Sequence, residues 1–78
     1  MKPEQLLIRF ARGEFKNVSL RDFQRFLEHY SFRLARVTGS HHIYTRSDLR
    51  EIVNLQDVNG EAKPSQIRQV IKLIEWHH

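Results

Sequence analysis

The hydrophobic period of this chain changes at Phe32, and that change restricts the kind of fold that the chain can form. Before this point, apolar residues recur every three or four positions, which places them on one face of a helix. They are Leu20, Phe23, Phe26, Leu27 and Tyr30. From Phe32 onward, apolar and polar residues alternate as in a strand. A helical period followed by strands predicts an α+β domain.

Three helices are expected. The first begins at Pro3 and ends at Gly13, because proline suits the first helical turn and glycine the position after the last. The second begins after Ser19, whose hydroxyl can cap the helix. The third begins at Pro64. Its apolar side consists of Ile67, Val70, Ile71 and Ile74.

Three antiparallel strands are expected between the second and third helices. One starts at Phe32, one covers residues 41–45 and one covers residues 51–55. Gly39 and Ser40 join the first two as a hairpin turn, because glycine accepts positive φ and serine can hydrogen-bond locally. Residues 56–63, which include an Asn-Gly pair, are expected to form a loop. The order predicts a three-stranded sheet with helices packed on one face.

The sequence pattern does not show which face of the second strand points toward the helices. One face carries His41, Ile43 and Thr45, and the other carries His42 and Tyr44. Each set contains a large apolar residue, so the pattern leaves both orientations open. Because His41 directly follows the turn, we expect it to be accessible in either case.

Length and composition limit the class of protein. The 78 residues predict one domain, 1–78, with residues 1–16 as an N-terminal helical extension and 19–75 as the core. The absence of cysteine excludes disulfides and thiolate metal sites. Neither a secretory signal nor an apolar run of about 18 residues is found, so we expect a soluble, cytoplasmic protein with no membrane contact.

The chain carries 13 Lys and Arg against 9 Asp and Glu, a net charge of +4. Most of these cations are arginines, whose planar fork matches phosphate well. The charge favours a polyanionic partner such as nucleic acid, although many small domains carry similar charge for solubility.

His41 is the principal candidate for chemistry. Histidine exchanges protons readily near neutral pH, and a hairpin holds the residue after its turn in a fixed place. The alternative is that His41 is only a polar residue at a strand start. No cysteine nucleophile, glycine-rich phosphate loop, zinc-protease motif or metal-ligand spacing is present.

The segment from Phe32 to Tyr44 follows the pattern Phe-x-Leu-x-Arg-x-x-Gly-Ser-His-His-Ile-Tyr. With the flanking helices, it resembles the HicA family of toxin ribonucleases over Leu20 to Ile74. The resemblance implies a fold like the double-stranded RNA-binding domain, with the first helix as an addition. It also implies an endoribonuclease that cleaves mRNA without a cofactor, with His41 as its catalytic residue and a HicB-like antitoxin that covers it.

Metal-free RNA cleavage is chemically accessible to such a chain. The 2′-OH attacks the adjacent phosphate while a base removes its proton, an acid protonates the leaving 5′-oxygen, and cations neutralise the phosphorane. His41 can fill one of the first two roles. The other proton-transfer group is not identified; His42 and Tyr44 are near in sequence but point away from His41, and water can serve instead.

Several cations near the hairpin are candidate phosphate contacts. They are Arg33, Arg36, Arg46 and Lys63, each of which can equally be an ordinary surface cation. Gly39 and Ser40 support the site through the turn, and Ser40 could also hydrogen-bond His41 or a phosphate. The chain departs from the family pattern at Ser31, where glycine is usual, and at residues 54–56 and 62–64, where proline and histidine are often found.

Two other functions fit the same residues. A noncatalytic RNA-binding module would use the basic hairpin to hold RNA by shape and phosphate contacts. A protein interaction domain would use the first helix to dock a partner. Loss of RNA cleavage in a His41→Ala variant separates the enzyme from both alternatives.

Overall fold

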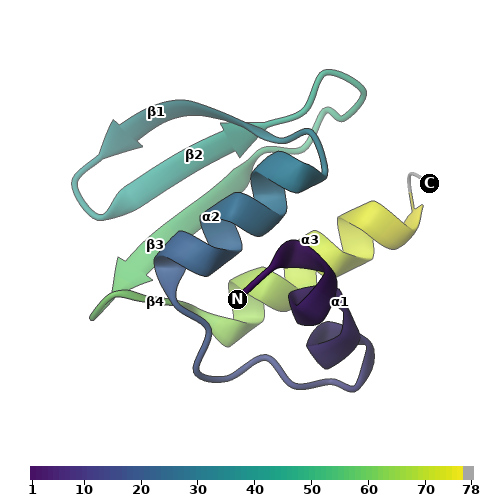
Figure 1. Ribbon diagram of the computed structural model, residues 1–78. Coiled ribbons are helices and arrows are strands. Elements are labelled where there is room, and N and C mark those ends of the chain that lie inside the picture. Colours follow the sequence, from purple (N-terminus) through teal and green to yellow (C-terminus); the bar gives the residue numbers. More distant parts are fainter. Residues whose placement is uncertain (77–78) are drawn as a thin grey trace.

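The computed structural model describes residues 1–76 and has three helices and a four-stranded antiparallel sheet of order β1-β2-β3-β4 (Figure 1). The α+β class expected from the sequence is therefore confirmed. The elements are α1 (Pro3–Ala11), α2 (Leu20–His29), β1 (Arg33–Thr38), β2 (His41–Thr45), β3 (Val53–Val58), β4 (Glu61–Ala62) and α3 (Pro64–Trp76). Within residues 1–76, no helix is long and apolar enough to cross a membrane.

The helix ends lie at the residues that predicted them. Pro3 is the first residue of α1, and Gly13 takes a φ of 76° just after that helix ends. Ser19 caps α2, because its hydroxyl oxygen accepts the backbone N–H of Asp22 at 3.0 Å. Capping residues of this kind typically contribute about 1 kcal/mol to helix stability.

The end of α2 is a Schellman motif built around a residue with unfavourable φ. The N–H of Phe32 donates to the carbonyl of Leu27, and the N–H of Ser31 donates to that of Glu28, both at 3.0 Å. Ser31 takes a φ of 69°, the left-handed region in which glycine is unstrained. The chain therefore uses serine where the backbone geometry favours glycine. Phe32, expected to start the strand, closes this motif, and β1 begins one residue later.

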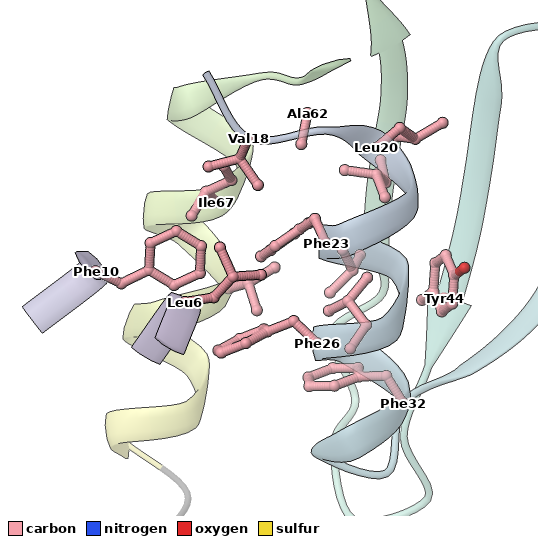
Figure 2. Packing of buried hydrophobic residues seen from close by; sticks show 14 of the residues in the cluster. Leu6, Phe10, Val18, Leu20, Phe23, Phe26, Phe32, Tyr44, Ala62 and Ile67 are labelled. Atoms are coloured by element: carbon pink, nitrogen blue, oxygen red, sulfur yellow. The ribbon is translucent and has the colours of Figure 1, made fainter. Parts of the chain in front are cut away.

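One core joins the helices to a single face of the sheet (Figure 2). The apolar stripe of α2 supplies four fully or nearly fully buried side chains at its centre, as the helical period predicts. On the sheet side, Tyr44, Val53 and Leu55 are 2%, 3% and 0% exposed. Leu6 and Phe10 bring α1 into the same core, so the N-terminal extension packs onto the domain. Figure 1 shows α2 and α3 on the same side of the sheet, and α1 packs against α2.

The strand register contains a bulge that the alternating pattern did not predict. Leu34 pairs with Tyr44 and Arg36 pairs with Ile43, so Ala35 is an extra residue in β1. Because paired residues share a face, the bulge places Arg36 on the same face as Arg33. A strict two-residue period would have put these two arginines on opposite faces.

The prediction of three strands was wrong. Asn59 and Gly60, assigned to a loop, take φ values of 53° and 79° and form a two-residue hairpin turn between β3 and β4. Asn-Gly suits such turns because both positions need positive φ. Two bonds join the turn and β4 to the start of α2: Ala62 N–H to Val18 carbonyl and Leu20 N–H to Gly60 carbonyl, both 2.9 Å.

The predicted bounds of the third strand, 51–55, were also wrong. β3 begins at Val53, opposite Tyr44, and continues through Gln56 and Asp57. These polar residues stay in the strand because Gln56 pairs with His41 and the Asp57 N–H donates to the Ser40 carbonyl at 2.8 Å. Backbone pairing decides the end of this strand.

Replacing Ser31 by glycine is expected to stabilise the fold. Glycine removes the steric cost of positive φ, about 1–2 kcal/mol for an L-residue, and part of that gain is offset by the greater freedom of glycine in the unfolded chain. We expect Ser31→Gly to raise the free energy of unfolding by roughly 0.5–1 kcal/mol, measured by urea denaturation. Ser47→Gly, at an exposed turn serine whose φ is not positive, serves as the control and should not stabilise. Equal behaviour of the two variants would contradict the strain argument.

Candidate functional site

The face of the sheet opposite the helices carries the candidate site. The residues that share this face follow from the register: His41, Ile43 and Thr45 on β2 lie opposite the face that holds Tyr44 in the core. The partners of these residues across each ladder share their face. They are Thr38, Arg36 and Arg33 on β1, and Gln56 and Asn54 on β3.

The turn before β2 fixes His41 at one end of this face. Gly39 takes a φ of 58°, the conformation for which the sequence favours glycine. The Ser40 carbonyl accepts the Asp57 N–H at 2.8 Å, so the turn is tied to β3 as well as to β1. This bond involves the backbone carbonyl of Ser40 and not its hydroxyl. His41 itself is partly exposed, which leaves its ring accessible.

Among the residues described, one side chain bonds to the His41 ring, and sequence reasoning missed it. Nδ1 of His41 lies 2.9 Å from Oδ1 of Asn54 on the neighbouring strand. The sequence singled out Asn54 only as a departure from the family pattern. Its contact with His41 depends on the β2–β3 register, which could have been found only by aligning His41 with Gln56 across a turn of uncertain length.

Ile43 forms an apolar floor beside the histidine. It is 9% exposed although it faces away from the helices, and it is not part of the core cluster that joins helices and sheet. Its neighbours across the two ladders are Arg36 and Asn54. The open face therefore contributes no side chain to the core through Ile43, but neighbouring side chains on that face cover Ile43 almost completely.

His42 and Tyr44 lie on the helix side, as alternation from His41 requires. Nδ1 of His42 is buried and has no hydrogen-bond partner among the residues described. Burial raises the pKa of Tyr44 above its usual value; the charge of Glu28 raises it further, and a hydrogen bond from Gln24 opposes the rise. Both side chains are thus separated from His41 by the sheet, and neither is placed to exchange a proton with a ligand there.

Arg36 and Arg33 are exposed on the open face at increasing distance from His41. Arg36 lies opposite Ile43, two residues along the strand from His41, which corresponds to roughly 7 Å. Arg33 lies opposite Thr45, four residues along, or roughly 13 Å. The structure therefore places two of the four predicted cations in a row on the same face as the histidine.

Arg46 is held by the protein itself. Its Nε and Nη2 donate to the two carboxylate oxygens of Asp48 at 2.7 and 3.1 Å, and its Nη1 donates to the Tyr30 carbonyl at 3.2 Å. Its guanidinium also stacks 5.0 Å from the centre of the Phe32 ring. With a side chain only 13% exposed, at the far end of β2 from His41, Arg46 anchors the end of the sheet.

Lys63 follows β4 and precedes α3. Its side chain is exposed, and its carbonyl accepts the N–H groups of Gln66 and Ile67 at the start of the helix. Two strand spacings, roughly 10 Å, separate the line of β4 from β2. Arg36, on the strand next to β2, is therefore closer to the histidine than Lys63 is.

The chain is thus a small α+β domain whose open sheet face combines a histidine with exposed arginines. The family described as "HicA toxin of bacterial toxin-antitoxin" matches residues 20–76. The chain therefore belongs to the HicA toxin family. No curated protein and no solved structure matches the chain. The match excludes α1, which this chain adds to the matched region.

No group of three or more histidine and carboxylate side chains converges as a possible metal site in the part of the chain that the structure describes.

Arg46 and Arg36 are expected to differ in their effect on stability. Arg46→Gln removes an ion pair, a bond to a backbone carbonyl and a cation–π contact, and should lower the free energy of unfolding by about 1–2 kcal/mol. Arg36→Gln, the same change at an exposed site, should alter it by less than about 0.5 kcal/mol. Urea denaturation of both variants measures the difference. A neutral Arg46→Gln would refute the anchoring role.

Proposed function

We propose that this protein is a toxin endoribonuclease that cleaves mRNA without a metal ion, with His41 as its general acid or base. The observation that carries the proposal is the placement of His41, accessible on the open face, within the region that matches the HicA family. Arg36 and Arg33 on the same face supply positive charge next to it.

The proposed reaction uses the nucleophile that RNA itself carries. A bond forms between the 2′-oxygen and phosphorus while the bond from phosphorus to the 5′-oxygen breaks. The 2′-OH loses a proton to a base, and the leaving 5′-oxygen gains one from an acid. His41 acts in one of these transfers and water in the other, because His42 and Tyr44 lie on the opposite face. The products are a 2′,3′-cyclic phosphate and a 5′-hydroxyl.

The cations would place the RNA and stabilise the transition state. Arg36 is close enough along the sheet to reach the phosphate that reacts or its neighbour, and Arg33 a phosphate further along the strand. Lys63 is proposed as an outer contact on the other side of His41. Arg46 is left out of this set because its guanidinium is bound to Asp48 and Tyr30.

Family membership implies a cognate antitoxin, which we propose is HicB-like and covers the surface around His41. We further propose that the α2-β1-β2-β3-α3 order belongs to the double-stranded RNA-binding-domain type, with α1 and β4 as additions. In that arrangement the helices stabilise the sheet and leave its other face to the ligand. A toxin of this kind acts on mRNA in the cytoplasm.

The proposal is tested by incubating the protein with a long single-stranded RNA in EDTA. We expect cleavage to fragments with 2′,3′-cyclic phosphate ends, and a loss of about a hundred- to ten-thousand-fold in rate for His41→Ala. His29→Ala, at an exposed histidine on α2, is the control and should cleave normally. An RNA with a single 2′-deoxynucleotide should resist cleavage at that position. Circular dichroism confirms that each variant folds.

The outcome also decides between the proposal and the binding module. If the parent and His41→Ala shift the RNA equally on a gel and leave it intact, the protein binds RNA without cleaving it. Cleavage by His41→Ala at the parental rate would contradict the assigned role of His41. Toxicity on expression, lost in His41→Ala alone, would connect the activity to growth arrest.

RNA affinity should depend on the arginines of β1. We expect Arg33→Gln and Arg36→Gln each to weaken binding of catalytically inactive His41→Ala protein and to reduce the slope of log K against log salt by about 0.7 for single-stranded RNA. Arg25→Gln, at an exposed position on α2, removes the same charge from the helical side and is the control. Fluorescence anisotropy over a range of salt concentrations measures the slopes. Equal slopes in all three variants would place the RNA elsewhere.

A further inference from the structure

We infer that Asn54 is a positioning residue that determines which nitrogen of His41 carries out proton transfer. The inference rests on the proposed function and assigns the reactive atom within it. Asn54 accepts a hydrogen bond from Nδ1–H of His41, so that Nε2 is the nitrogen that gains and loses a proton at the substrate.

The sheet fixes both partners of this hydrogen bond. His41 pairs with Thr38 on one side and Gln56 on the other, and Asn54 pairs with Ile43. His41 and Asn54 are thus diagonal neighbours on one face, a separation that longer side chains can bridge. Nδ1 and Oδ1 lie 2.9 Å apart, the usual length of an N–H···O bond. The contact is therefore part of the backbone register of β2 and β3.

The chemistry of the two groups selects one form of the ring. A neutral imidazole has one N–H and one lone pair, whereas an amide oxygen can only accept. Because Oδ1 of Asn54 faces Nδ1, that nitrogen keeps its hydrogen in both the neutral and the protonated ring. The proton that is exchanged is then always the one on Nε2.

This arrangement keeps the ring orientation constant through the reaction. As a base, Nε2 takes the proton of the 2′-OH while the bond from the 2′-oxygen to phosphorus forms. As an acid, Nε2 gives its proton to the 5′-oxygen while the bond to phosphorus breaks. In either role Nδ1–H remains bound to Asn54, so the ring keeps the same orientation before and after the transfer. Orientation of a base by a third group is a general feature of acid–base and nucleophilic sites.

Gln56 provides a matched control on the same strand. It lies directly opposite His41 and on the same face as Asn54. Its backbone N–H donates to Oε1 of Gln66 at 2.8 Å, which ties β3 to α3. Gln56→Leu therefore removes a side-chain amide that is at least as close to His41 along the ladder as that of Asn54. It leaves the acceptor of Nδ1–H in place.

The first measurement needs no RNA. Two-bond proton–nitrogen correlation spectra of ¹⁵N-labelled protein show which ring nitrogen of each neutral histidine carries hydrogen. We expect Nδ1–H for His41 in the parent, in Gln56→Leu and in Asn54→Asp, which keeps an acceptor oxygen in place. In Asn54→Leu, the tautomer populations of His41 should approach those of exposed His29. A parent His41 with unprotonated Nδ1 would overturn the inference.

The second measurement separates kcat from KM for RNA cleavage. Loss of one hydrogen bond in Asn54→Leu should lower kcat about tenfold with little change in KM. Asn54→Asp should retain most of kcat but raise KM, because its charge repels phosphate. Gln56→Leu should keep kcat. An unchanged kcat in Asn54→Leu, with a changed tautomer, would overturn the positioning role.

The two measurements can overturn the nuclease function and the positioning role independently. If Nδ1–H is held by Asn54 but the parent does not cleave RNA, the proposed nuclease function is overturned and the hydrogen-bond assignment stands. If the parent cleaves RNA and Asn54→Leu has neither a changed tautomer nor a reduced kcat, the positioning role is overturned and the nuclease function stands.

Discussion

Burial of one face of β2 against the helices is the constraint on which the rest of the structure depends. Tyr44 is 2% exposed beneath α2, and the two adjacent positions of β3 that face the same way are equally buried. Because side chains alternate along a strand, fixing Tyr44 inward directs His41 and Ile43 outward. A shift of one residue in this register would bury the histidine and expose the tyrosine. The packing of the core therefore also sets the orientation of the candidate catalytic group.

The ends of the sheet are fixed by different interactions. At the end near His41, the Gly39–Ser40 turn is bonded to Asp57, and the two-residue turn at Asn59 and Gly60 leads into β4. At the other end, Arg46 joins Asp48, the Tyr30 carbonyl and the Phe32 ring. One arginine thus connects the end of α2 with the end of β2. These partners of Arg46 depend on tertiary contacts, so its nearness to a hairpin in the sequence did not indicate them.

Sequence reasoning succeeded where one residue type determines the local geometry. Pro3, Ser19 and Gly39 lie at the helix start, the cap and the turn that they predict, and the apolar stripe of α2 is the centre of the core. It failed where pairing between distant segments decides the outcome. The bulge at Ala35, the polar end of β3 and the short β4 are stabilised by ladder partners, and such partners are not visible in a local pattern.

In the candidate site, too, local features could be predicted and features that depend on strand pairing could not. The turn residues and His41 are adjacent in the chain and could be named from it, whereas Asn54 lies thirteen residues away and meets His41 only through the β2–β3 register. The common face of Arg33 and Arg36 likewise depends on the bulge.

The open face holds His41 and Asn54 by backbone pairing, while the apolar side chains that stabilise the fold gather on the other side. Substitution of exposed side chains on the open face is therefore expected to cost the fold little. Ile43 is the exception, because it is buried on this face and supports the ladder between the arginine and the asparagine. A substitution of Ile43 would change both the surface beside His41 and the stability of the sheet. Substitutions of the exposed residues around Ile43 would change that surface alone.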